Sequence, residues 1–107
     1  GGVVAAYRAV RQSFPNVLIE VEVTSAEQAR EVVAAGATEV LLDNMTVPEM
    51  AAIVTELRDS ATFEASGGLT IENATEVAQT GVNFVAVGAI THSATVLDIA
   101  LDFASEN

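Results

Sequence analysis

The chain has 107 residues, with 15 acidic residues, four arginines, no lysine and a formal net charge of −11. This balance excludes nucleic acid as a partner, because such binding rests on Lys and Arg that neutralise phosphates. The lack of cysteine excludes disulfides and thiolate metal sites, and no apolar run approaches the ~18 residues of a membrane span. We therefore expect a cytoplasmic protein that binds neither nucleic acid nor membrane.

The chain opens with a predicted helix followed by a predicted strand. Apolar residues recur at helical spacing over residues 3–14, and Pro15 ends that pattern. Residues 17–23 alternate as a β-strand does, with aliphatic side chains on one face and Glu20 and Glu22 on the other.

Two capped helices and a second strand follow. A capping box, in which Ser or Thr is followed three residues later by Gln or Glu, marks a helix start. One such helix begins at Ser25 and ends at Gly36, and another begins at Thr46 and runs to about Arg58. Between them, residues 39–43 read as the second strand.

The same alternation continues to the end of the chain. Residues 62–65 predict a third strand, Thr70 starts a helix that Gly81 ends, and residues 82–87 predict a fourth strand before a last helix. Strands that alternate with helices through short loops pair in parallel and cross over with right-handed connections. No linker interrupts the series, so we expect one domain over residues 1–107.

Acidic residues recur at an interval of 21 residues, at Glu22, Asp43 and Glu64, each near the end of an apolar run. Carboxylates at strand ends are typical of the C-terminal rim of a parallel α/β barrel. A complete barrel needs roughly 250 residues. We therefore predict a partial parallel (β/α) barrel, four strand–helix units preceded by one helix, as the C-terminal part of a longer protein or a piece cut from one.

Strand periodicity turns four carboxylates toward the barrel interior, those of Glu20, Glu22, Asp43 and Glu64, because helices cover the outside. Like charges this close need a cation or protonation. All four arginines fall on helical segments, so the cation must come from elsewhere. We interpret Glu22 and Asp43 as functional, leave Glu64 open between a structural and a functional role, and expect Glu39 to be a solvated strand end.

Two glycine-bearing turns predict an anion site on the last two units. Ser66-Gly67-Gly68 precedes a helix start, and Gly88-Ala89 precedes the final helix. Backbone N–H groups at such turns and helix ends bind phosphate. His92, the only histidine, either binds a phosphate or substrate carboxylate at this rim or is a polar loop residue beside a helix cap. One histidine and no cysteine do not make a zinc site.

Taken in order, these motifs resemble the quinolinate phosphoribosyltransferase family over nearly the whole chain. The resemblance rests on Ile19-Glu20-Val21-Glu22-Val23, Leu41-Leu42-Asp43-Asn44-Met45, Glu64-Ala65-Ser66-Gly67-Gly68-Leu69-Thr70, Gly81-Val82 and Val87-Gly88-Ala89-Ile90-Thr91-His92-Ser93 with Leu97-Asp98-Ile99. It implies the C-terminal portion of an open α/β barrel that follows an N-terminal α/β domain, in a homodimer or higher homo-oligomer.

The resemblance also implies an activity and a set of roles. The family joins quinolinate to the ribose of phosphoribosyl diphosphate and releases diphosphate and CO₂, which gives nicotinate mononucleotide for NAD synthesis. Glu22 and Asp43 are then catalytic, meeting the ribose hydroxyls and a Mg²⁺-bound diphosphate directly or through water. The phosphate-binding set is Ser66, Gly67, Gly68, Gly88, Ala89, Ile90 and His92.

The chain departs from the family in lacking the upstream Arg and Lys that hold the anionic substrates. We therefore expect this chain alone to be inactive. Two other readings stay open: a paralogue with another substrate, such as the molybdenum-transport-associated relative, or a truncated, non-catalytic domain that associates through its unpaired outer strands.

Overall fold

The computed structural model describes residues 2–86, which form one parallel sheet and a layer of helices. The sheet has four strands in the order β1-β2-β3-β4. The strands are β1 (Glu20–Val23), β2 (Glu39–Asp43), β3 (Thr62–Ser66) and β4 (Phe84–Val85), and the helices are α1 (Gly2–Ser13), α2 (Ala26–Ala34), α3 (Val47–Leu57) and α4 (Ile71–Ala78). The predicted alternation is confirmed; the last predicted helix lies outside the described residues.

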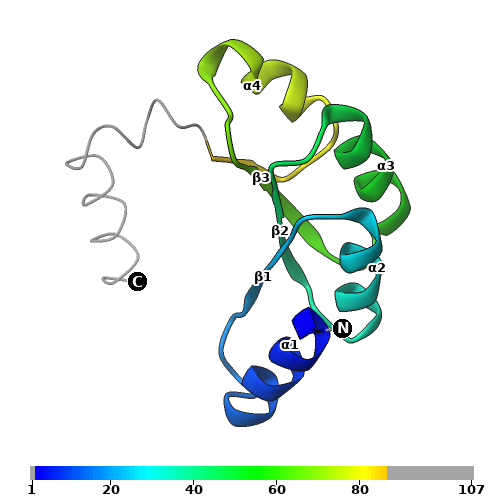
Figure 1. Ribbon diagram of the computed structural model, residues 1–107, viewed down its shortest axis with the longest axis vertical. Helices are drawn as coiled ribbons and strands as arrows, with labels where there is room; N and C mark the ends of the chain where they lie inside the picture. Colours follow the sequence, from blue (N-terminus) through cyan, green and yellow to red (C-terminus); the bar gives the residue numbers. More distant parts are fainter. Residues whose placement is uncertain (1, 87–107) are drawn as a thin grey trace, which may run out of the picture.

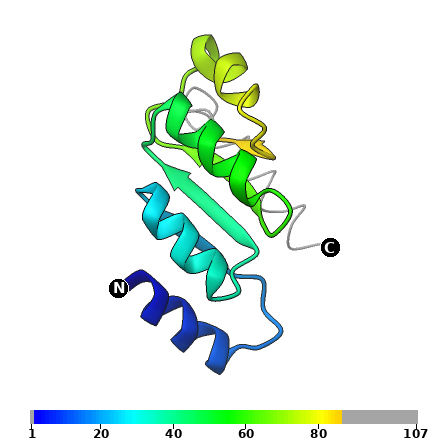
Figure 2. The ribbon, with the colours of Figure 1, turned by 90° about the vertical axis from the view of Figure 1, so that its right-hand side faces the viewer.

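All four helices lie on one side of the sheet (Figure 1). Seen from that side, they stack in chain order from α1 to α4 in front of the strands (Figure 2). Each strand runs parallel to the next and is reached through one helix, as βαβ units require. The opposite face of the sheet has no helix from the described part of the chain.

Alternate strand residues build the core against this helical layer. The burial patterns of β1, β2 and β3 alternate strictly, with every second side chain buried. Phe63 and Leu42 are among the largest of these side chains, and every fully buried side chain in the described residues is apolar. Removing this apolar surface from water is the main stabilising term of the fold. The buried strand residues are Val21, Val23, Val40, Leu42, Phe63 and Ala65.

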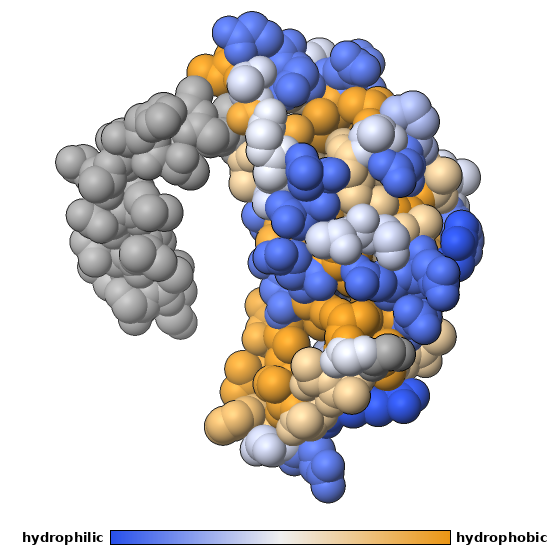
Figure 3. Space-filling model, viewed as in Figure 1, coloured by the Kyte–Doolittle hydropathy of each residue, from blue (hydrophilic) through white to orange (hydrophobic). Residues whose placement is uncertain are grey.

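The first predicted strand is longer than the observed one. Leu18 is 76% exposed, and Arg11 donates hydrogen bonds to the carbonyls of Pro15 (3.0 Å) and Val17 (2.9 Å), which hold this segment in a turn. Pairing begins only at Glu20, opposite the first residue of β2. Figure 3 shows the apolar surface that results, gathered over α1 and the turn into β1.

The other strand ends also follow pairing. Ser66 extends β3 by one residue because it pairs with Asp43. The fourth strand is confined to Phe84–Val85 among the residues described, and Val87 lies outside them.

Side-chain caps define three helix starts. Thr46 forms the predicted capping box with Glu49, and Thr70 forms a similar box with Asn73. At Ser25 only half of the predicted box is present: Ser25 accepts from the Gln28 N–H at 3.2 Å, whereas the Gln28 side chain accepts from the Thr24 N–H at 2.8 Å. The side-chain oxygen of Gln28 therefore accepts from the backbone N–H of Thr24, one residue before the Ser25 N–H that a complete capping box would use.

The Thr46 cap predicts a measurable loss of stability. Thr46→Ala removes the acceptor of the Glu49 N–H and should lower the free energy of unfolding by about 1 kcal/mol. Thr55→Ala, at an exposed position inside the same helix, should be neutral or slightly stabilising, because alanine is the better helix former. Urea unfolding of both variants checks this, and an equal loss in the two would contradict it.

Candidate functional site

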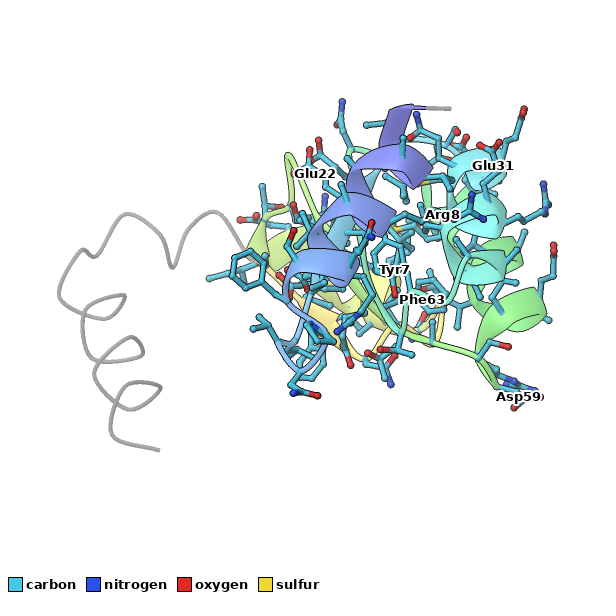
Figure 4. The ribbon with its side chains drawn as sticks, turned by 90° about the horizontal axis from the view of Figure 1, so that it is seen from below. Tyr7, Arg8, Glu22, Glu31, Asp59 and Phe63 are labelled. Carbon is cyan, nitrogen blue, oxygen red and sulfur yellow. The ribbon has the colours of Figure 1, made fainter. Side chains whose placement is uncertain are left out.

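The face of the sheet opposite the helices carries the predicted carboxylates. Glu20 and Glu22 are exposed on it, and Asp43 and Glu64 are half-buried, while their strand neighbours are buried against the helices. In Figure 4, Glu22 lies on the opposite side of α1 from Arg8 and Glu31. The predicted orientation of all four carboxylates is therefore confirmed.

Strand register arranges this face in rows. Glu22 pairs with Leu41, Leu41 with Glu64, and Glu64 with Phe84, so these side chains form one row across the sheet. Asp43 pairs with Ser66, one side-chain level nearer the C-terminal rim. Strand spacing and rise put the Cα atoms of Glu22 and Asp43 roughly 8 Å apart.

The glycine turn meets the Asp43 carboxylate at this rim. Gly67 has φ +87°, and a Cβ at that position would lie 2.7 Å from Asp43 Oδ1 and 2.8 Å from the Asn44 backbone nitrogen. Only glycine combines this conformation with so close an approach. The predicted carboxylate and the predicted anion turn are thus brought into contact, and Ser66 and Gly68 flank the contact in the chain.

Asn44 belongs to the same rim and was not among the predicted site residues. It has φ +56°, and its N–H donates to the Ser66 carbonyl at 2.9 Å, which ties the end of β2 to the turn after β3. An Asn directly after a strand-ending Asp is the available signal, because Asn enters the left-handed region more readily than other non-glycine residues.

The first turn of α4 contributes less to an anion site than predicted. The Thr70 N–H donates to the Asn73 side chain (2.9 Å), and the Asn73 N–H donates to the Thr70 hydroxyl (3.4 Å). The carboxylate of Glu72 accepts from its own N–H, which lowers the pKa of Glu72 below its usual value. Because these donors serve capping, the candidate anion site is the glycine turn rather than the helix end.

A second group of polar side chains lies on the same face, at the N-terminal ends of the strands. The Thr62 hydroxyl donates to the Glu39 carboxylate, so Glu39 is half-buried and bonded rather than the solvated end that was expected. Partial burial raises the pKa of Glu20, and the neighbouring charge of Glu64, a hydrogen bond to Glu64 and the charge of Glu39 raise it further. Proton uptake by Glu20 is one way in which this group relieves its repulsion.

The arginines lie elsewhere, as expected. Arg8 and Arg11 are on α1, Arg58 caps α3, and Arg30 on α2 binds both carboxylate oxygens of Glu56 through Nε, at 3.0 and 2.9 Å. None of these positions is on a strand, so the acidic face receives no arginine from the strands that form it.

Part of the predicted site lies outside residues 2–86, the part of the chain that the structure describes. Gly88, Ala89, Ile90 and His92 lie outside the described residues. Within residues 2–86 no group of three or more His, Asp or Glu side chains is arranged to hold a metal ion. In the same range, none of the helices has the length and apolar character needed to span a membrane.

The raised pKa of Glu20 predicts how stability depends on pH. A carboxyl whose pKa is higher in the folded state adds stability below its unfolded value of 4.5, and that stability is lost as the pH rises through the folded value. Glu20→Gln should therefore raise the Tm at pH 7, and the gain should vanish below about pH 4. Thermal unfolding at both pH values tests this against Glu76→Gln, an exposed position on α4. Equal Tm changes for the two variants at pH 7 would refute it.

Comparison with known proteins agrees with this geometry. The family described as quinolinate phosphoribosyl transferase, C-terminal domain, matches residues 1–102. A nicotinate-nucleotide pyrophosphorylase [carboxylating] from Mycobacterium leprae is 46% identical over 106 residues, which cover 95% of this chain and 37% of that protein. This chain therefore spans little more than a third of that relative's length.

Solved structures extend the likeness to the fold. The nicotinate-nucleotide pyrophosphorylase from Francisella tularensis superposes with a TM-score of 0.78 at 32% identity, over 84% of this chain and 33% of that one. A thiamine phosphate pyrophosphorylase from Pyrococcus furiosus superposes with a TM-score of 0.68 at 28% identity, over 74% of this chain and 42% of that one. The parallel α/β architecture, the ordered motifs and the extent of the match lead to one conclusion. The chain belongs to the quinolinate phosphoribosyl transferase family, as a member of its C-terminal domain.

Proposed function

We propose that this chain supplies the ribose- and phosphate-binding wall of a carboxylating nicotinate-nucleotide pyrophosphorylase. Such an enzyme transfers phosphoribose from phosphoribosyl diphosphate to quinolinate with loss of CO₂. The contact between Gly67 and Asp43 carries the proposal, because it sets an anion-binding turn beside a carboxylate at the carboxyl ends of two parallel strands. The description of the matching family names quinolinate, which favours this substrate over that of a paralogue.

The carboxylates fit the chemistry of displacement at an anomeric carbon. As diphosphate leaves, positive charge develops on the ribose, and fixed negative groups stabilise it in the transition state. Glu22 and Asp43 lie on the neighbouring strands β1 and β2 and point to the same face of the sheet. Asp43 lies at the C-terminal rim, and Glu22 lies one side-chain level below it. A 5′-phosphate held by the Ser66-Gly67-Gly68 turn would leave the sugar over these two side chains.

A divalent cation fits the same place. Mg²⁺ is commonly bound by one or two carboxylates completed by substrate phosphates and water. A carboxylate that touches the anion turn also needs a counter-charge when phosphate binds. We propose that Glu22 and Asp43 hold Mg²⁺ directly or through water; the ion would neutralise charge on the leaving diphosphate.

Quinolinate requires cationic groups that this face does not supply. The chain has a net charge of −11, and its arginines lie on helices or at a helix end. We propose that sequence outside this chain provides them, in a homodimer or higher homo-oligomer located in the cytoplasm. Residues 1–107 then form the C-terminal part of the barrel.

Gly67→Ala tests the phosphate turn. The added methyl group would strain a positive φ and collide with Asp43 and Asn44, so the affinity for ribose 5-phosphate in the presence of MgCl₂ should fall at least tenfold, about 1.4 kcal/mol. Gly36→Ala is the matched control, since Gly36 has φ +111° and the nearest atom to an added Cβ is the Tyr7 hydroxyl at 3.6 Å.

Both variants are titrated by NMR after circular dichroism has shown that they fold. Weakened binding in Gly67→Ala with normal binding in Gly36→Ala supports the turn as the phosphate site. Unchanged binding in Gly67→Ala contradicts it.

The isolated chain should show no turnover. Quinolinate carries two carboxylates, and the strands that form the described acidic face place no arginine beside them, so the chain alone should not hold quinolinate next to phosphoribosyl diphosphate. Nicotinate mononucleotide is measured by chromatography after incubation with both substrates and Mg²⁺, with the Mycobacterium leprae relative as the positive control. Product formation by the 107-residue chain alone would show that the missing cationic groups are not required.

A further inference from the structure

The side chain of Asn44 is a polar group at the C-terminal rim that has no part in the site described so far. Asn44 directly follows Asp43 at the end of β2, and its side chain is exposed. Its backbone N–H is bonded to the Ser66 carbonyl, but its carboxamide makes no hydrogen bond within residues 2–86. In the described part of the chain this carboxamide is therefore free to bind a ligand.

The backbone conformation of Asn44 does not by itself require this side chain. Its φ of +56° is a conformation that glycine adopts most easily, and asparagine is among the few other residues that visit it routinely. The hydrogen bond to Ser66 uses only the backbone N–H, at 2.9 Å. A glycine would serve both needs but would carry no side-chain donor, so the carboxamide calls for a separate explanation.

The carboxamide borders an open space above Gly68. A Cβ on Gly68 would stand 3.9 Å from Asn44 Oδ1, and apart from the chain neighbours of Gly68 no other heavy atom of the described residues lies within 4 Å of that point. Around Gly67, by contrast, atoms of Asp43 and Asn44 lie 2.7 to 3.1 Å from the corresponding point. Gly67 thus gives room to the chain itself, whereas Gly68 leaves room for a ligand.

The size of this space suits a phosphate group. A Cβ stands about 2.5 Å from its own backbone nitrogen, so Asn44 Oδ1 lies at most about 6.4 Å from the Gly68 nitrogen. Rotation about χ2 exchanges the oxygen and the NH₂ group of the carboxamide. Two hydrogen bonds of about 2.9 Å, accepted by different oxygens of one phosphate, span this distance.

Charge indicates which side of the turn the phosphate takes. Asp43 faces Gly67 with a carboxylate, which repels phosphate, whereas Asn44 faces Gly68 with a neutral amide that can donate two hydrogen bonds. Residues 59–86 contain neither Arg nor Lys, so donors close to the turn in sequence are backbone amides and uncharged side chains. A hydrogen bond to a charged phosphate oxygen is roughly twice as strong as one between neutral groups.

We propose that Asn44 is a phosphate-contacting residue, whose carboxamide N–H donates to the 5′-phosphate above Gly68. This role rests on the phosphate site proposed above and extends it by a side-chain donor. The two consecutive residues at the end of β2 then divide the substrate between them: Asn44 holds the phosphate, and Asp43 faces the sugar and the metal ion.

Two substitutions at Asn44 separate its side chain from its backbone. Asn44→Gly keeps the N–H and the positive φ but removes the carboxamide, so the affinity for ribose 5-phosphate in the presence of MgCl₂ should fall about tenfold. Asn44→Asp also tolerates this conformation but replaces the donor with a carboxylate, so it should weaken binding further. Gln79→Glu, exposed at the opposite end of α4 from the turn, adds the same charge and should leave the affinity unchanged.

NMR titration measures the affinities after circular dichroism has shown that each variant folds. In the wild type, the side-chain NH₂ resonances of Asn44 should shift on binding, a response that a purely structural role does not produce. Their absence in Asn44→Gly identifies them, and Asn44→Asp identifies the same resonances if Asn44→Gly does not fold.

The outcomes separate this role from the phosphate site itself. Equal affinity of the wild type and Asn44→Gly, or NH₂ resonances that do not move at saturation, would overturn the role of Asn44. If Gly67→Ala alone weakens binding, the phosphate turn stands without Asn44. A wild-type chain that binds no ribose 5-phosphate would overturn both.

Discussion

Within residues 2–86, helices cover only one face of this parallel sheet, and the rest of the described structure depends on that asymmetry. Alternation along each strand sends Val21, Val40 and Phe63 into the core and their acidic neighbours to the other side. Parallel sheets are normally covered on both faces. Here the open face collects carboxylates, and partial burial, followed by the neighbouring charges of Glu64 and Glu39, raises the pKa of Glu20. The core stabilises the fold while the open face keeps a charge that a ligand, a metal ion or another chain segment can neutralise.

At the C-terminal rim of the sheet, a backbone hydrogen bond brings the glycine turn and a strand-end carboxylate together. The Asn44 N–H bonds to the Ser66 carbonyl, and this bond carries the sheet's pairing one step past the end of β2. It draws the glycine turn against Asp43, where any side chain at Gly67 would collide. The glycine turn and the Asp43 carboxylate therefore occupy one edge of the sheet, as the proposed sugar-phosphate site requires. Glycine at this position serves the approach of two chain segments as well as the conformation of the turn.

Local signals predicted most of the fold. The Thr46 cap, the alternation in the strands and the stop at Gly36 each depend on residues close in sequence, and the structure confirms them. Features set by distant partners were missed. The residue pattern predicts that Leu18 lies in a strand, but Leu18 pairs with no strand among the described residues. Ser66 joins β3 only because Asp43 lies beside it. At the site, strand periodicity correctly predicted which face Glu22 and Asp43 point to. The left-handed backbone of Asn44 and the hydrogen bonds that occupy the N–H groups at the start of α4 could be recognised only in the folded structure.

The central claim is that the open face of the sheet and the glycine turn form one sugar-phosphate site. A crystal structure of this chain with ribose 5-phosphate and Mg²⁺ measures it directly. The account predicts phosphate oxygens about 3 Å from the backbone nitrogens of Gly67 and Gly68, with the ribose on the Asp43 side of the turn. Phosphate bound among the helices, or ribose directed away from Asp43 and Glu22, would contradict it.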